Sequence, residues 1–159
     1  MKRIAIVVFS LFAFVSASAF AKGPGGVTAF GVYGSFISST TGTTSGSSLG
    51  LTAKFGSFPV LGLQYLISSN PRLGMSCDYY IIDSARIGGI FTYFVGAGLY
   101  GGFAFGDSTA FDFGLRVPVG IQAWLVKKIE LYLAGVPMIP LVPQPGFNFG
   151  AELGFRVHF

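Results

Sequence analysis

Charged residues are scarce in this 159-residue sequence: Asp, Glu, Lys and Arg make up 10% of it, against 52% for hydrophobic residues. A soluble domain usually carries about 25% charged residues. The shortage argues against an ordinary soluble surface and favours a protein that exposes apolar side chains to lipid.

Cysteine and histidine are scarcer still, with one residue of each, Cys77 and His158. A single cysteine cannot form an internal disulfide, and the sequence has no Cys-x-x-Cys motif or Cys/His cluster for zinc. No Ser or Cys nucleophile can be placed beside His158, so we favour a hydrogen-bonded histidine over a catalytic base. The glycine clusters are not followed by Gly-Lys-Ser/Thr and predict no phosphate-binding loop. We therefore expect no enzymatic activity, no cofactor and no metal site.

Apolar segments suited to a membrane helix are also lacking. Residues 87–105 carry no charge and approach the length of about 20 residues that a membrane helix needs. They are rich in glycine and aromatic residues, however, a composition that suits a strand better. The other apolar stretch, residues 131–142, is interrupted by Pro137 and Pro140. A helical membrane protein is the alternative prediction.

The most regular pattern in the sequence is its last stretch, residues 147–159, FNFGAELGFRVHF. Side chains of a strand point alternately to opposite faces, so this stretch predicts one apolar face and one polar or small face. Such a strand suits a wall between lipid and a polar lumen; an edge strand of a soluble sheet is the alternative. The polar or small face comprises Asn148, Gly150, Glu152, Gly154, Arg156 and His158.

Residues 1–21 have the features of a secretory signal peptide. Lys2 and Arg3 precede an apolar core, and Ala19 and Ala21 supply the small side chains that signal peptidase requires. Cleavage would leave one domain, residues 22–159; a retained N-terminal anchor is the alternative. Because the leader removes two positive charges, the remaining excess is too small to predict nucleic-acid binding.

After the leader, period-two segments alternate with turn-rich segments, at lengths suited to transmembrane strands of about 9–11 residues. We predict an all-β fold, an eight-stranded antiparallel transmembrane up-and-down β-barrel with both chain ends at the periplasmic side. The longest loops, residues 39–47 and 135–146, then lie outside the cell. Pro118 removes one ladder hydrogen bond, so we expect a bulge there. The predicted strands are residues 28–38, 48–55, 59–67, 73–82, 90–103, 111–125, 129–134 and 147–159.

The interior of an eight-stranded barrel is just wide enough for side chains to fill it. Charges of both signs face this predicted interior, and a buried unpaired charge is costly, so we expect ion pairs. Arg116 and Glu130 lie on adjacent predicted strands and are candidates for one pair. We favour a plugged polar core over a gated conduit. The predicted interior polar network comprises Lys54, Asp78, Asp112, Arg116, Glu130, Glu152 and Arg156.

The end of the chain resembles the closing-strand signal of bacterial outer-membrane barrels, with Glu152, Gly154, Val157 and Phe159 at matching positions. This resemblance implies recognition by the barrel-assembly machinery. The whole chain is similar to OmpA-like eight-stranded transmembrane domains, including the OmpX and OmpW types. More specifically, LRVPVGIQAW at 115–124 and KIELYL at 128–133 resemble a family of small spirochaetal outer-membrane barrels.

These resemblances imply a non-enzymatic, monomeric protein of the bacterial outer membrane, surrounded by outer-membrane lipid. Some spirochaetal members bind host complement regulators. We therefore expect extracellular loops that serve adhesion or bind a host surface or serum protein. A small pore or hydrophobic-ligand conduit through the lumen is the alternative function.

Overall fold

The computed structural model of the protein describes residues 26–40, 45–67, 71–105 and 110–159. The predicted signal peptide and loop residues 41–44, 68–70 and 106–109 lie outside these ranges. Within the described ranges, no helix has the length and hydropathy needed to cross a membrane. The described strands are β1 (Thr28–Ser39), β2 (Gly46–Phe55), β3 (Val60–Ile67), β4 (Arg72–Gly88), β5 (Phe91–Ala104), β6 (Ala110–Arg116), β7 (Val119–Val126), β8 (Ile129–Val142) and β9 (Asn148–His158).

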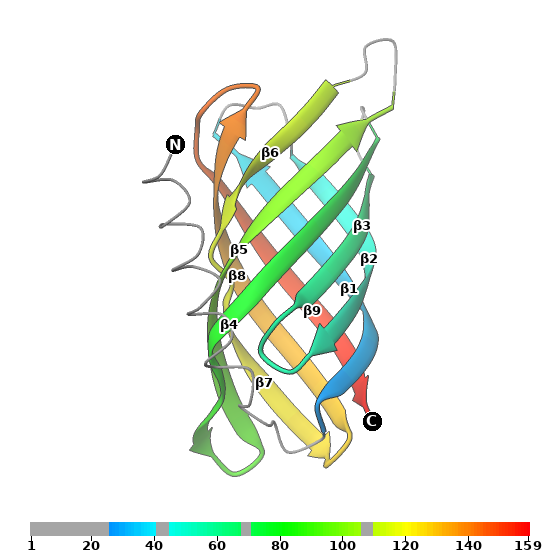
Figure 1. Ribbon diagram of the computed structural model, residues 1–159, viewed down its shortest axis with the longest axis vertical. Coiled ribbons are helices and arrows are strands. Elements are labelled where there is room, and N and C mark those ends of the chain that lie inside the picture. Colours follow the sequence, from blue (N-terminus) through cyan, green and yellow to red (C-terminus); the bar gives the residue numbers. More distant parts are fainter. Residues whose placement is uncertain (1–25, 41–44, 68–70, 106–109) are drawn as a thin grey trace, which may run out of the picture.

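The strands form one closed antiparallel barrel (Figure 1). Consecutive strands pair from β1 to β5, β8 pairs with β9, and β9 pairs with β1 to close the wall. β6 and β7 share one position, because each pairs with β5 on one side and with β8 on the other. The predicted eight-stranded antiparallel barrel is therefore confirmed.

The barrel has two different ends. The C terminus lies at one end with the β4–β5 and β7–β8 turns (Figure 1), and we name this end the C-terminal mouth. The opposite end, where β1, β3, β5 and β8 end, is the loop mouth.

Pro118 separates β6 from β7 without shifting the register. Arg116 is opposite Gly98 and Val119 is opposite Val95, so an advance of three residues from β6 to β7 matches three residues on β5. The expected bulge is therefore wrong: the ladder is interrupted, but no extra residue is inserted. The Pro118 carbonyl still accepts a hydrogen bond from the Gly96 N–H at 2.8 Å. Gly96 also leaves room for the buried pyrrolidine ring of Pro118, since a Cβ at position 96 would lie 3.1 Å from Pro118 Cγ.

β8 is longer than predicted, and most of the expected 135–146 loop belongs to it. β9 pairs with β8 as far as Met138, whereas β6 pairs with it as far as Val142. Pro140 thus lies where only one neighbour pairs with the strand, and a proline without an N–H is tolerated in such a position. The connection between β8 and β9 shrinks to residues 143–147.

Residues 87–105 contain the end of β4, a turn and β5. Gly89 has a φ of +57° in the turn, a conformation that glycine adopts at little cost. The alternative prediction of a membrane helix over this stretch is therefore wrong.

The outer wall is apolar, as it is in barrels that face lipid. Exposed outward side chains include Leu49, Met75 and Leu153. Aromatic pairs lie towards both ends: Phe30 contacts Phe159 at 6.5 Å between centroids near the C-terminal mouth, and Phe103 and Phe111 stand 5.1 Å apart near the loop mouth. Apolar side chains thus cover the outside while most polar ones face inward.

Candidate functional site

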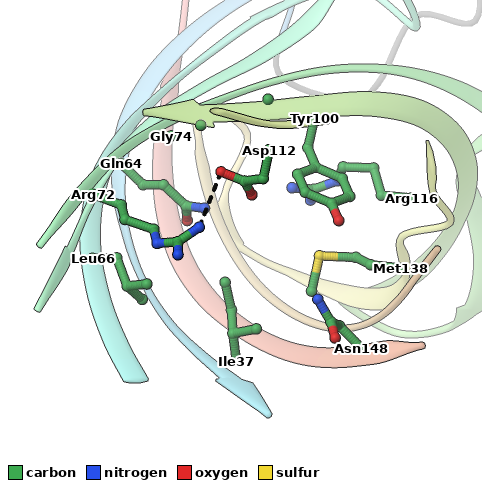
Figure 2. Close-up of a pocket in the computed structure, with 12 residues that line it drawn as sticks. Ile37, Gln64, Leu66, Arg72, Gly74, Tyr100, Asp112, Arg116, Met138 and Asn148 are labelled. Carbon is green, nitrogen blue, oxygen red and sulfur yellow. Dashed lines mark hydrogen bonds and ion pairs between the residues drawn. The ribbon is translucent and has the colours of Figure 1, made fainter. Parts of the chain in front are cut away.

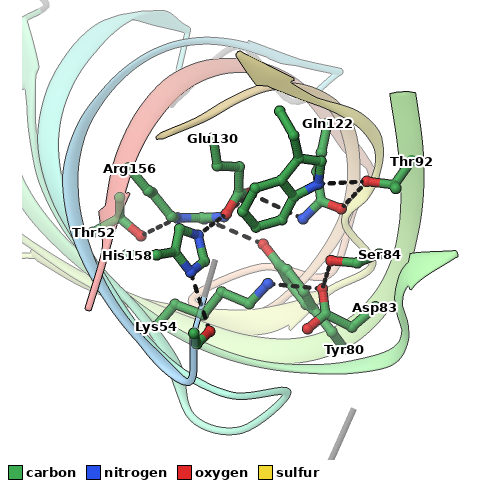
Figure 3. A network of polar contacts seen from close by, with 12 residues as sticks. Thr52, Lys54, Tyr80, Asp83, Ser84, Thr92, Gln122, Glu130, Arg156 and His158 are labelled. Atoms are coloured by element: carbon green, nitrogen blue, oxygen red, sulfur yellow. Dashed lines mark hydrogen bonds and ion pairs between the residues drawn. The ribbon is translucent and has the colours of Figure 1, made fainter. Parts of the chain in front are cut away.

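Glu130 is the centre of a buried polar network at the C-terminal mouth (Figure 3). Its Oε1 accepts hydrogen bonds from Arg156 Nη1 at 2.8 Å and from Gln122 Nε2 at 3.0 Å. Its Oε2 lies 2.6 Å from His158 Nε2. The strand register explains the first contact, because Glu130 on β8 is directly opposite Arg156 on β9. One carboxylate therefore joins three neighbouring strands.

The network continues from Gln122 towards β5. Thr92 Oγ1 donates to Gln122 Oε1 at 2.9 Å and accepts a hydrogen bond from Trp124 Nε1 at 3.0 Å. All three side chains are buried. A buried polar group needs a partner to offset its lost hydration, and here each one has it.

Arg156 extends the network across the lumen in the other direction. It donates to Thr52 Oγ1 at 3.2 Å and to Tyr80 OH at 3.3 Å, and its Cζ lies 3.9 Å from the Tyr132 ring centroid. Tyr80 in turn stacks on Phe94 with 4.6 Å between centroids. Guanidinium and aromatic rings together fill the cross-section of the barrel.

Lys54 pairs with a residue that the sequence interpretation missed. Its Nζ lies 2.7 Å from Asp83 Oδ1, and the two side chains are only 3% and 1% exposed. Regular alternation from Asp78 would turn Asp83 outward, but β4 has register shifts on both sides of Ile82, and Ser84 adopts a φ of 56°. Such irregularities re-aim side chains in a strand, and period-two alternation alone gives no signal for them.

Arg116 lies further along the lumen between two carboxylates. Its Nη2 donates to Glu152 Oε1 at 2.8 Å, and its Nε forms an ion pair with Asp78 Oδ1 at 3.1 Å that lacks hydrogen-bond geometry. The predicted pair of Arg116 with Glu130 is wrong. Arg116 faces Met138 on β8, eight residues along the strand from Glu130, which is roughly 27 Å at 3.4 Å per residue.

Near the loop mouth, Arg72 Nη1 lies 3.3 Å from Asp112 Oδ1 (Figure 2). Arg72 was not among the predicted interior residues because the predicted strand began one residue after it. The pair borders a pocket whose walls also include Tyr100, Met138 and Asn148. This end of the lumen is less tightly filled than the C-terminal mouth.

The structure places all seven predicted network residues in the lumen, but in three separate groups. The first group, at the C-terminal mouth, contains Lys54, Glu130 and Arg156. In the second group, Arg116 lies between Asp78 and Glu152. Asp112 lies apart from both, near the loop mouth. Among the described residues, no three His, Cys, Asp or Glu side chains are grouped so as to hold a metal ion.

Thr92→Val is expected to lower the free energy of unfolding by about 1–2 kcal/mol, because it leaves the Trp124 N–H and the Gln122 carbonyl buried without their partner. Urea unfolding in detergent, followed by fluorescence, measures this directly, since Trp124 is the sole tryptophan. Thr92→Ser keeps the hydroxyl and serves as the control. Equal losses for both variants would contradict the assignment to hydrogen bonding.

No protein-family model matches this sequence, and a search of curated proteins finds no match. Solved structures do match. Neisserial surface protein A (NspA) is 17% identical, with a TM-score of 0.52 over 83% of this chain and 96% of NspA. The N-terminal β-barrel domain of Pseudomonas aeruginosa OprF is 13% identical, with a TM-score of 0.51 over 83% of this chain and 98% of that domain. The chain therefore has the fold of eight-stranded outer-membrane barrels.

Proposed function

We propose that the protein is a non-enzymatic, monomeric barrel of the bacterial outer membrane, which uses its loop mouth for adhesion or for binding a host surface or serum protein. The observation that carries this proposal is the filled C-terminal mouth, where Glu130 and Arg156 are buried among hydrogen-bonded and aromatic side chains. A barrel closed in this way supports function on its outer surface rather than passage through its lumen.

Three features support the location. The outer wall is apolar, the fold is shared with outer-membrane barrels, and residues 1–21 resemble a signal peptide. The residues that resemble an assembly signal lie on β9 and just after it: Glu152 faces the lumen and Phe159 is exposed on the outside. We propose that the barrel-assembly machinery reads this strand before it pairs with β1.

An epitope-insertion experiment tests both location and orientation. A tag between Thr43 and Thr44 should bind antibody on intact cells. A tag between Lys127 and Lys128, in the β7–β8 turn, should bind only after the outer membrane is permeabilised. Labelling of the second tag on intact cells would overturn the orientation, and labelling of neither after permeabilisation would overturn the location.

The likeness of residues 115–133 to small spirochaetal barrels motivates the host-binding part of the proposal. Replacing the β8–β9 connection, residues 143–147, by a Gly/Ser linker should abolish binding of the cells to immobilised serum proteins. The heat-dependent shift in gel mobility that marks a folded barrel should be retained. Unchanged binding by the folded variant would rule out this loop as the binding surface.

A conduit through the lumen is the alternative function. Measurements of ion conductance distinguish it from the proposed loop function. We expect the wild-type barrel to give no discrete current steps in a planar lipid bilayer, because the C-terminal mouth is filled. Arg116→Ala should also stay silent, since the network around Glu130 remains in place. A general porin provides the positive control, and wild-type steps that change with Arg116→Ala would favour the conduit.

A further inference from the structure

The loop mouth contains a space that the loop-binding proposal does not use. Two adjoining cavities of about 30 and 220 Å³ share Arg72, Tyr100, Asp112 and Asn148 as lining residues. We name this space the vestibule and define it by these four residues (Figure 2). One water occupies about 10–15 Å³ by this measure, so the vestibule has room for a small organic molecule. It is smaller than a drug-sized site of about 300–1,000 Å³.

Opposite charges stand side by side in the vestibule. The side chains of Arg72 and Asp112 are each 13% exposed, and their contact of 3.3 Å is longer than the 2.7–2.8 Å of the pairs Lys54–Asp83 and Arg156–Glu130. A contact between one nitrogen and one oxygen does not use all the hydrogen-bonding capacity of the two groups, because a guanidinium has five N–H donors and a carboxylate about four acceptor sites.

Two further polar atoms of the vestibule are buried without a hydrogen-bond partner in the described part of the chain. These are the Tyr100 hydroxyl oxygen and Asn148 Oδ1. Asn148 is 4% exposed, and its side chain points into the pocket (Figure 2). Native proteins rarely leave such groups unpaired, and here one potential donor and one acceptor face the space beside the charge pair.

Part of the inner wall of the vestibule is apolar; Gln64 and Arg116, which also line it, are hydrogen-bonded to Ser48 and Glu152. Ile37, Leu66 and Met138 are buried and line the smaller cavity. The polar and charged groups therefore meet an aliphatic surface in one small space. A ligand that satisfies all of them carries a positive group, a negative group and a short apolar chain.

We infer that the vestibule binds a small zwitterion with an aliphatic side chain, the chemistry of a free α-amino acid. Arg72 and the Tyr100 hydroxyl hold the carboxylate, Asp112 and Asn148 Oδ1 accept hydrogen bonds from the ammonium group, and the side chain packs against Met138. Charge-assisted hydrogen bonds of this kind are about twice as strong as neutral ones. A neutral polyol would leave the charge pair unused, and the site is therefore assigned to the zwitterion.

Methionine methyl resonances test the inference in the folded barrel in detergent micelles. Met138 lies in the vestibule wall, whereas Met75 is 61% exposed on the outer face and serves as an internal control. With ¹³C-methyl-methionine labelling, titration with L-leucine should shift the Met138 signal saturably in the millimolar range and leave Met75 in place. N-acetyl-leucine amide, which has the side chain but neither charge, should produce no saturable shift.

Two variants and one control complete the test. Arg72→Gln and Asp112→Asn should each weaken the apparent leucine affinity at least about tenfold, as expected for loss of a hydrogen bond to a charged group. Arg86→Gln, at the other mouth, should leave it unchanged. No shift of Met138 by leucine, an equal shift by N-acetyl-leucine amide or by glucose, or unchanged affinity in both folded vestibule variants would each overturn the inference.

Discussion

Glu130→Ala should lower the free energy of unfolding by about 3–5 kcal/mol, the cost of breaking a buried ion pair by removing one partner. The substitution leaves the Arg156 guanidinium buried at 2% exposure and removes the acceptor for Gln122 and the neighbour of His158. Urea unfolding in lipid vesicles, with heat-dependent gel mobility as the readout of folding, measures the effect.

The partner substitution separates charge burial from lost packing. Glu130→Leu combined with Arg156→Met removes both charges, and replacing a buried pair by apolar residues is often neutral or stabilising. We expect the double variant to be more stable than Glu130→Ala. Arg86 is exposed and serves as the control: Arg86→Ala should change the free energy of unfolding by no more than about 0.5 kcal/mol. A double variant as unstable as Glu130→Ala would show that the cost is not electrostatic.

Gly31→Ala should cost about 3 kcal/mol, at the upper end for overpacking, because β1 meets β9 at this position with no room for a side chain. A Cβ at Gly31 would overlap the backbone oxygen of Phe155 and lie 2.8 Å from Arg156 Cα. Backbone atoms of a paired strand cannot move aside as a side chain can, so the seam that closes the barrel must open. Unfolding in urea and the fraction that refolds from urea into vesicles both report this loss.

Gly34 provides the matched control on the same strand. It faces outward, and a Cβ there would meet its nearest atoms, Ser48 O and Leu49 Cδ2, at ordinary distances of 3.7 and 3.8 Å. Gly34→Ala should therefore be neutral or stabilising by up to about 1 kcal/mol, through the reduced freedom of the unfolded chain. If the two alanine variants were equally unstable, strand flexibility rather than space would explain the effect.

Alternation in the sequence predicts most of the fold because barrel strands have one apolar and one polar face. It identifies β9 and the shared position of β6 and β7, and it places Glu130 and Arg156 in the lumen. It fails where a local feature overrides the period. Pro140 suggested a loop, yet it lies in the part of β8 that pairs on one side only.

The pairing of interior charges was harder to predict than their direction. Whether a side chain faces the lumen depends on its place in the alternation along its own strand. Which side chains pair depends on the register between strands, and this register places Arg116 opposite Met138 rather than near Glu130. Asp83 was missed because the predicted strand ended at residue 82, whereas β4 continues to Gly88 through an irregular stretch that turns Asp83 inward. Side-chain alternation is a local property of a strand, whereas the register is set by the whole closed sheet.

The proposed outer-membrane location requires the chain to cross the inner membrane first, and the side-chain alternation bears on that step. β2 interrupts its apolar side chains at every second position with small or polar residues such as Thr52 and Lys54, whereas β8 is mostly apolar after Glu130 but is only 14 residues long. A translocation machinery that retains continuous apolar segments of about 20 residues finds no such segment in these strands. The apolar outer wall therefore exists only after the barrel has closed, which is compatible with the proposed export of the unfolded chain through water.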